Sequence, residues 1–302
     1  MSDTAAGLVD AHHHLWDLAA RAQDWLAEPA YAPIRRTFTV DDLRATATLP
    51  IAGRRLRGSV VVQCVTSVAE TEELLALAGR DPLVRAVVGW ADLADPAVGE
   101  VVDRLREGPG GGFLRSLRHL VQAETDPEWL QRPAVERGLA ALAERGLGYD
   151  VLVRAGQLPQ AVRLAERLPQ LRLVLDHAGK PPIATGDLTG WRRHVRALAA
   201  HPQVCCKVSG LVTEADHASW TTADIRPVWE VLLEAFGPGR LMYGSDWPVC
   251  VVAGGWDRWA GTVGELVGEL SPGEQHAIVA ATATAFYRID ELPPARLEGT
   301  LP

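Results

Sequence analysis

The chain has 302 residues, of which 47% are hydrophobic, 23% charged and 6% aromatic, a balance typical of a folded globular protein and unlike a disordered one. Thirty Lys and Arg against 38 Asp and Glu give a formal net charge of −8, which disfavours nucleic acid as a partner. No apolar run reaches the roughly 18 to 20 residues of a membrane span, and the N-terminus lacks the pattern of a secretory signal. We therefore expect no membrane partner and a cytoplasmic location.

Eight short apolar segments are bounded by polar residues, Gly or Pro, as is typical of strands buried on both faces. They are Leu8–His12, Ser59–Cys64, Arg85–Trp90, Arg115–His119, Tyr149–Val153, Arg172–His177, Val204–Ser209 and Arg240–Asp246. Segments with helical periodicity lie between many of them: Val40–Thr48, Glu70–Gly79, Pro133–Gly146, Leu158–Leu168, Gly190–Ala200 and Pro227–Gly237. This alternation predicts a parallel α/β sheet, for which we favour a (β/α)₈ TIM barrel spanning residues 1–302 as one domain over an open doubly wound sheet.

The stretch from Asp17 to Arg57 is long and rich in Pro, Arg and aromatic residues. In a barrel it would be an elaborated first βα loop at the mouth, where loops carry function. Trp16 and Trp247 lie in predicted mouth segments, where an indole can stack on a sugar ring. Packing in the core is the competing explanation for such residues.

Three consecutive histidines, His12 to His14, follow the first predicted strand. Side chains alternate along a strand, so His12 and His14 project to one side while His13 projects to the other. Two imidazoles on one face favour a divalent metal site. A leftover purification tag or a solvated turn is the alternative, but three histidines are fewer than a usual tag and the flanking Val9 and Leu15 are apolar.

Two later strands end in groups of the same kind. Asp176 and His177 close the sixth predicted strand, and Asp246 lies at the C-terminal end of the eighth, where barrel enzymes place catalytic groups. Capping of a following turn is the structural alternative for the two acids. His12, His14, His177 and Asp246 together offer the nitrogen and oxygen ligands of one zinc-like ion with an open position for water. This set predicts a hydrolase in which Asp246 is the general base.

The sequence resembles the amidohydrolase superfamily, specifically its amidohydrolase-2 branch of sugar-lactone hydrolases of the L-fuconolactonase and L-rhamnonolactonase type. The segments that carry the resemblance are VDAHHHLWD, VVVQCV, LRHLVQ, YDVLV, LVLDHAGKP, CCKVSGL and YGSDWPV, with Thr284–Tyr287 matching a closing helix. They run in family order over nearly the whole chain. The DHxGKP and GSDWP motifs together are fairly specific to this branch.

The resemblance implies a (β/α)₈ barrel that opens a lactone ring by attack of water. It matches His12 and His14 to the H-x-H pair, His177 to the histidine of the sixth strand and Asp246 to the aspartate of the eighth. His177 and Asp246 are thus implied to be both catalytic and metal-binding. The fifth strand, YDVLV, lacks the histidine of many superfamily members, which implies one metal ion instead of two, and some lactonases of this branch act without a required metal.

Cations at other strand ends suit a lactone, because they can stabilise an oxyanion or bind substrate oxygens. Strand alternation places Arg118 opposite His119, and we favour His119 and Lys207 as inward-facing substrate-binding residues over Arg118. The further candidates for binding substrate hydroxyls or charges are Lys180 and Glu124. For Arg118, Lys180 and Glu124, a solvated surface charge is the plain alternative.

The expected activity is therefore that of a carboxylic-ester hydrolase acting on a small-molecule aldonolactone. Two other enzymes of the same superfamily stay open, a 2-pyrone-4,6-dicarboxylate lactonase and a metal-dependent decarboxylase. Both would need an arginine cluster for an extra carboxylate, and arginines at predicted strand ends are few. A non-catalytic barrel that only binds a sugar acid is the third alternative, and it has no need of the general base that Asp246 offers.

Overall fold

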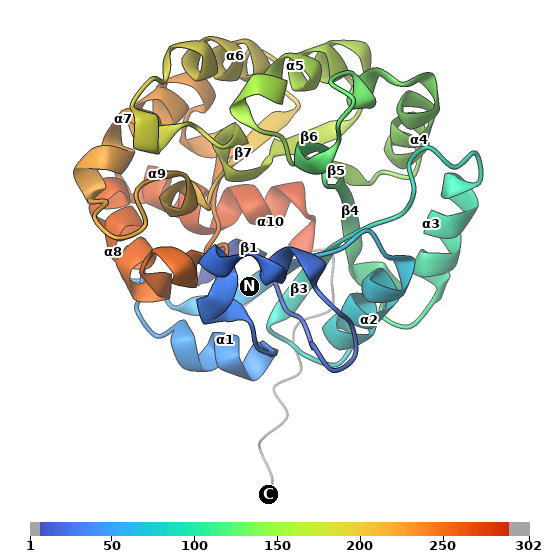
Figure 1. The fold of residues 1–302 in the computed structure, drawn as a ribbon, viewed down its shortest axis with the longest axis horizontal. Coiled ribbons are helices and arrows are strands. Elements are labelled where there is room, and N and C mark those ends of the chain that lie inside the picture. The colour runs from blue at the N-terminus through green and yellow to red at the C-terminus, as the bar shows by residue number, and fades with distance from the viewer. Residues whose placement is uncertain (1–6, 290–302) are drawn as a thin grey trace, which may run out of the picture.

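The computed structural model describes residues 7–289. Eight parallel strands lie side by side in the order of the chain, with a helix following each of them on the outside, as Figure 1 shows. The strands are β1 (Leu8–His13), β2 (Leu56–Val62), β3 (Val84–Gly89), β4 (Leu114–His119), β5 (Gly148–Val151), β6 (Arg172–Leu175), β7 (Val204–Val208) and β8 (Leu241–Tyr243). The predicted barrel of parallel strands is confirmed.

The barrel closes between its last and first strands just beyond the end of β8. The amide of Asp246 donates to the carbonyl of His12 at 2.8 Å, and the amide of His14 donates to the carbonyl of Trp247 at 2.7 Å. These bonds join the histidine segment directly to the segment that carries Asp246. Closure of the barrel therefore brings together two motifs that are more than two hundred residues apart in sequence.

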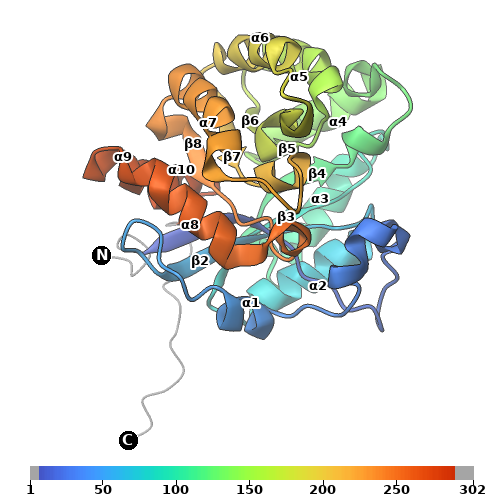
Figure 2. The same cartoon turned by 60° about the vertical axis from the view of Figure 1, so that its left-hand side comes forward.

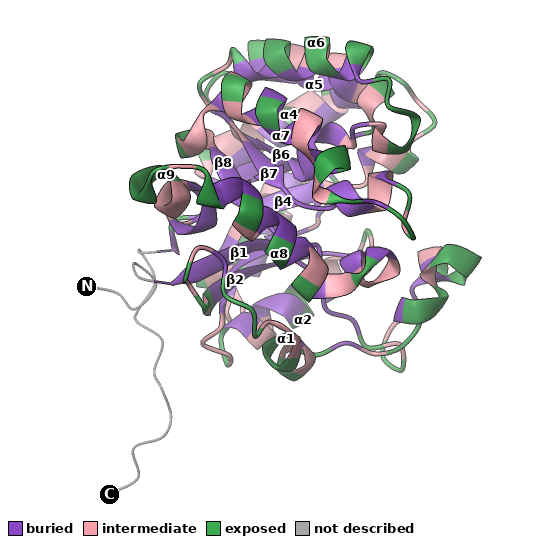
Figure 3. Ribbon diagram, turned by 90° about the vertical axis from the view of Figure 1, so that its left-hand side faces the viewer, coloured by how far each residue is buried: buried purple, intermediate pink, exposed green. Residues whose placement is uncertain are grey.

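Ten α-helices are found in the described part of the chain, and eight of them surround the strands (Figure 2). They are α1 (Val40–Thr46), α2 (Val68–Ala78), α3 (Val98–Glu107), α4 (Pro133–Glu144), α5 (Leu158–Arg167), α6 (Thr189–Ala199), α7 (Thr222–Phe236), α8 (Gly255–Gly268), α9 (Pro272–His276) and α10 (Thr282–Phe286). Their exposed residues lie on the outside and the strands are buried (Figure 3). Among residues 7–289, no helix combines the length and the apolar character needed to cross a membrane.

Helix α7 begins earlier than its sequence predicted. The expected start was Pro227, because proline is common in the first turn of a helix. In the structure Thr221 and Asp224 form a capping box, in which the Asp224 carboxylate accepts from the Thr221 amide at 2.7 Å. The capping box satisfies the first amides of the helix and places Pro227 inside it.

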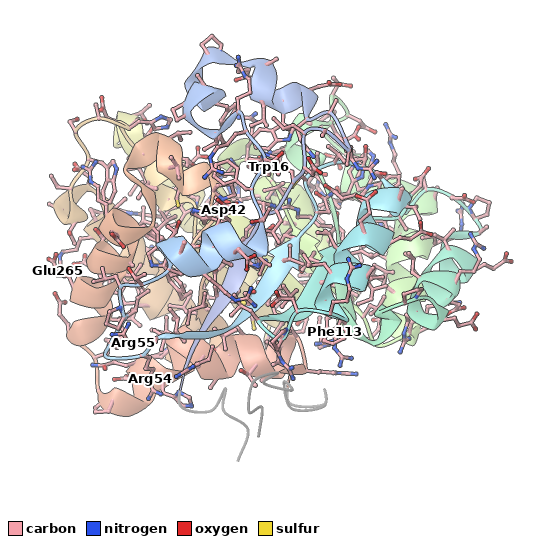
Figure 4. All side chains as sticks on the ribbon, turned by 90° about the horizontal axis from the view of Figure 1, so that it is seen from below. Trp16, Asp42, Arg54, Arg55, Phe113 and Glu265 are labelled. Carbon is pink, nitrogen blue, oxygen red and sulfur yellow. The ribbon has the colours of Figure 1, made fainter. Side chains whose placement is uncertain are left out.

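The two ends of the barrel differ in chemistry. At the end where the strands begin, α10 and the residues around it pack on inward-facing apolar side chains of the strands, among them Val9, Val60, Val88, Val174 and Met242. The segment of the first loop with the 3₁₀ helices Asp24–Ala27 and Pro29–Ile34 covers the opposite end. In Figure 4 Trp16 lies towards that upper end, while Phe113 and the end of the loop before β2, with Arg54 and Arg55, lie towards the lower one. The elaborated first loop is confirmed, and polar chemistry is concentrated at the end it covers.

Candidate active site

The histidines after β1 alternate as predicted. His12 and His14 face the same side, with their Nε2 atoms 3.2 Å apart, while His13 turns away and its Nε2 contacts Ser59 Oγ at 3.0 Å. His14 Nδ1 lies 2.8 Å from the carbonyl oxygen of Val62. A carbonyl only accepts, so the ring proton of His14 is on Nδ1 and the lone pair of Nε2 faces the interior of the site.

His177 and Asp246 complete the cluster from β6 and β8. Asp246 Oδ1 lies 3.6 Å from His14 Nε2, 3.8 Å from His12 Nε2 and 4.0 Å from His177 Nε2. Both residues adopt positive backbone φ angles, 51° for His177 and 53° for Asp246, which non-glycine residues rarely adopt. Such strain is often found at functional sites, where the surrounding structure maintains it.

Electrostatics determine the charge of three of these groups, His12, His177 and Asp246. Burial lowers the pKa of His177 to about 4, and burial together with the Lys207 ammonium keeps the pKa of His12 well below its usual value. Burial of Asp246 would raise its pKa, but His177, His14 and Lys180 outweigh it and the pKa is lowered. The result is neutral His12 and His177 imidazoles beside an ionised Asp246 carboxylate at neutral pH.

The donor set fits one divalent metal ion. A ligand atom from each of His12, His177 and Asp246 lies within 4.8 Å of the others, and His14 Nε2 presents its lone pair beside them. Metal binding requires neutral imidazoles and ionised carboxylates, which is the protonation state described above. The β5 strand contributes no histidine, and its Asp150 instead pairs with Lys207 at 2.6 Å, so β5 offers no ligand for a second ion.

A cavity of about 490 Å³ opens above these residues, a volume typical of small-molecule sites. His14, His177, Asp246 and Arg118 lie on its lining, and Lys180 and Glu214 form an ion pair of 3.0 Å at its side. An apolar part of the lining comes from the first loop and the segment after β8, with Trp25, Tyr31, Val249 and Val252. The cavity thus offers both polar and apolar contacts to a small ring.

The choice between Arg118 and His119 was wrong in sequence reasoning. Arg118 faces inward, where its Nη1 donates to Asp176 Oδ2 at 3.0 Å. His119 faces outward and stacks on Trp129, with ring centroids 4.0 Å apart, and its Nε2 contacts Glu124 Oε1 at 2.8 Å. Alternation shows only that neighbours face opposite sides, and it does not show which of the two faces inward. His119 and Glu124 are not on the lining of the cavity.

Lys207 faces inward as predicted, but it is fully buried below the cavity and binds Asp150 and Asp176 instead of lining it. Trp16 and Trp247 are also buried, and both pack edge-on against Phe38, with ring centroids 5.3 and 5.2 Å away. Both tryptophans therefore pack the first loop against the barrel and do not stack on a sugar ring in the cavity. Of the predicted substrate-binding residues, Arg118 and Lys180 line the cavity.

Several residues of the cavity were missed by sequence reasoning. They are Tyr31, Gln122, Arg154, Glu214 and His217. All lie in the loops and short 3₁₀ helices that follow strands, and no motif in the sequence distinguishes them from other polar loop residues. Asp150 could have been noticed, because an acid inside the apolar YDVLV strand requires a buried partner.

Replacing His119 provides a test of its outward placement. His119→Phe is expected to keep the stacking on Trp129 and to leave kcat/KM for a lactone unchanged. It should lower the free energy of unfolding by about 1 to 3 kcal/mol, because Trp90 Nε1 loses the acceptor it now has 3.1 Å away. Steady-state kinetics and urea unfolding measure the two effects. A large rise in KM at unchanged stability would contradict the placement.

Comparison with known proteins agrees with the resemblance to amidohydrolases. The family described as "Amidohydrolase" matches residues 9–289. An L-fucono-1,5-lactonase of Burkholderia multivorans is 38% identical over 300 residues, which is 96% of this chain and 98% of that protein. Another of Burkholderia ambifaria is 36% identical over 290 residues, 93% of this chain and 96% of that protein. A crystal structure of an amidohydrolase from Burkholderia multivorans with bound zinc has a TM-score of 0.85 and 37% identity, and the match covers 94% of this chain and 99% of that one.

Proposed function

This chain belongs to the amidohydrolase family, and from that premise we propose that it hydrolyses a sugar-derived lactone to the open hydroxy acid. The proposed substrate is an aldonolactone such as L-fucono-1,5-lactone, the compound named for two relatives that match more than nine-tenths of the chain. The observation that carries the proposal is the Asp246 carboxylate, whose Oδ1 lies within 4.0 Å of three imidazole nitrogens beside a cavity of about 490 Å³.

The proposed metal ligands are His12, His14, His177 and Asp246, and zinc is the proposed ion because it favours imidazole and carboxylate ligands. When bound, such an ion polarises a carbonyl and lowers the pKa of a bound water. Support for zinc comes from the related crystal structure that contains it.

In the proposed mechanism Asp246 acts as the general base. Its lowered pKa keeps the carboxylate ionised at neutral pH, so it can accept a proton from a water that attacks the lactone carbonyl. The bond between the carbonyl carbon and the ring oxygen then breaks, and the ring oxygen takes the proton from Asp246, which gives the hydroxy acid and restores the carboxylate. His177, 4.0 Å from Asp246, lies where it can orient the attacking water.

Arg118 and Lys180 supply positive charge to the same cavity. The negative charge that develops on the carbonyl oxygen and remains on the product carboxylate would be stabilised by these cations. Arg118 is 3% exposed and its guanidinium is fixed by Asp176 and Gln63, so its orientation is set before substrate binds. Lys180 is set by its ion pair with Glu214. A preorganised cation loses little free energy to reorientation during the reaction.

The decisive experiment is a pH-indicator assay over a panel of aldonolactones and aromatic carboxylic acids, with and without a chelator. We expect acid release from a six-carbon deoxy aldonolactone, loss of the activity after chelation, and recovery on adding zinc. Release of CO₂ from an aromatic acid without lactone turnover would contradict the proposed function and favour the decarboxylase. Lactone hydrolysis that persists after chelation would contradict the metal and leave the lactonase intact.

Two further predictions from the sequence accompany this proposal. The chain is proposed to be one catalytic domain over residues 1–302 and to act in the cytoplasm. A lactone is its proposed small-molecule partner.

A further inference from the structure

A set of buried polar groups lies below His12, on the side away from the cavity. The Lys207 ammonium is fully buried and lies 2.6 Å from Asp150 Oδ2, 2.9 Å from Asp176 Oδ1 and 3.0 Å from His12 Nδ1. The Tyr287 hydroxyl donates to Asp150 Oδ2 at 2.8 Å, and Ser116 Oγ donates to Asp150 Oδ1 at 2.5 Å. None of these contacts is needed for the proposed chemistry, so the set requires a separate explanation.

The contacts of Lys207 determine where the ring proton of His12 lies. An ammonium group donates and never accepts, so His12 Nδ1 accepts from Lys207 and the single ring proton of neutral His12 is on Nε2. That proton has an acceptor, because His14 presents the lone pair of its Nε2 at 3.2 Å. Lys207, His12, His14 and the Val62 carbonyl thus form one continuous series of hydrogen bonds.

Two neighbours favour the opposite arrangement. Asp176 Oδ1 lies 3.4 Å from His12 Nδ1, farther than the Lys207 ammonium at 3.0 Å, and could accept a proton from that nitrogen. Arg118 Nη1 lies 3.3 Å from His12 Nε2, where it would donate to a lone pair. This contact is longer than the 3.0 Å contact with Lys207, and Arg118 Nη1 already donates to Asp176 Oδ2 at 3.0 Å. The shorter contact and the available acceptor on His14 favour the proton on Nε2.

With the proton on Nε2, His12 cannot use that nitrogen to bind a metal ion. The ring proton must first be on Nδ1, for which Asp176 Oδ1 is the acceptor, 3.4 Å away. The same oxygen lies 2.9 Å from the Lys207 ammonium, so Lys207 and the Nδ1–H form of His12 compete for it. The change moves one proton from Nε2 to Nδ1 of the same ring and releases none.

We propose that Lys207 is a positioning residue that keeps His12 in the Nε2–H form and thereby weakens metal binding, whereas Asp176 accepts Nδ1–H in the metal-bound form. Lys207 acts through His12 and does not touch substrate. The inference rests on the metal centre of the proposed function. Lys207 would thus lower the affinity of the site for the metal ion, in addition to its role in packing.

Zinc affinity of the full chain, measured by competition with a chelating dye, tests the proposal. The double variant Lys207→Met/Asp150→Asn removes one positive and one negative charge, so the net charge near the site is unchanged, and the Arg118–Asp176 pair stays. We expect zinc to bind about 10- to 100-fold more tightly, the range by which groups contacting metal ligands alter affinity. Damage to the fold would weaken binding, so a gain in affinity is specific to the proposed role.

Arg145→Met/Asp103→Asn is the control, because it removes an ion pair of 2.8 Å that lies outside the cavity. Its zinc affinity should equal that of the unmodified chain. Unchanged or weaker zinc binding by a folded Lys207→Met/Asp150→Asn protein would overturn the proposal, as would an equal gain in the control.

The position of the proton can be read directly by NMR of metal-free protein labelled with ¹⁵N-histidine, since the two ring nitrogens shift strongly with protonation. Comparison with His12→Gln assigns the signals. We expect Nε2–H for His12 in the unmodified chain and Nδ1–H in the double variant, with His14 in the Nδ1–H form in both. Nδ1–H for His12 in the unmodified chain would overturn the proposal even if the double variant does not fold.

Absence of zinc binding by the unmodified chain would instead contradict the metal centre of the proposed function.

Discussion

Asp246→Asn is expected to lower the turnover of a sugar lactone by at least about 10²-fold, the usual contribution of a general base. The amide has nearly the same shape as the carboxylate but cannot accept the proton of the attacking water. His177, His14 and Lys180 outweigh the effect of burial and lower the pKa of Asp246, so its charge is available in the unmodified chain at neutral pH. Steady-state hydrolysis of the best lactone from the panel measures the loss.

The same substitution could reduce activity by releasing the metal, so zinc content must be measured alongside. Loss of turnover at unchanged zinc content identifies Asp246 as the base, whereas parallel loss of both identifies it as a ligand. Asp187→Asn, an exposed change outside the cavity, is the control and should retain full turnover. Unaltered hydrolysis by Asp246→Asn would reject both roles.

Gly210→Ala is expected to lower turnover by about 10²-fold, the scale of a misplacement of catalytic groups by about 1 Å. A Cβ at this position would lie 2.5 Å from His177 Nδ1 and 2.9 Å from Asp246 Oδ2. Either catalytic side chain must therefore move. Gly210 also has a φ of +60°, so an L side chain there costs about 1 to 2 kcal/mol of stability.

Gly186→Ala separates the two effects of that substitution. Gly186 has the same left-handed conformation, with a φ of +73°, but nothing lies within 4 Å of the added Cβ. It should lose a comparable free energy of unfolding and keep its turnover. Chemical unfolding and steady-state kinetics of both variants test this pairing. Equal turnover in Gly210→Ala and Gly186→Ala would show that the space beside His177 and Asp246 is not required.

Several features of the fold could be derived from the residues themselves. Buried strands require continuous apolar segments, and helices between them require apolar residues at helical spacing, so both were visible along the chain. The length of the first loop and the facing of His12 and His14 followed in the same way, because local backbone geometry determines them. The strand before Asp246 was also located, but it ends at Tyr243 and not at Asp246 as predicted.

The placement of other site residues depended on the closed barrel. Alternation left two choices for Arg118 and His119, and only the packing of β4 against its neighbours decided which faced inward. Lys207 was expected at the cavity, but its fully buried ammonium binds Asp150 and Asp176, two acids from neighbouring strands. A lysine in an apolar strand requires a partner, and the sequence does not show how far from solvent that partner lies.

The sequence by itself therefore determined the eight strands, most of the helices between them and the four residues that converge as candidate metal ligands, because hydrophobic pattern and residue type act locally. Helix α3 (Val98–Glu107) and helix α8 (Gly255–Gly268) were not predicted. Only the tertiary structure decided which polar groups line the cavity and which are buried beneath it and contact the proposed metal ligands. Whether a polar group lines the cavity depends on contacts between strands that are far apart in sequence. One example is the 3.0 Å contact between Lys207 Nζ and His12 Nδ1. Burial and hydrogen-bond partners arise from the closed barrel as a whole, and no single segment contains them.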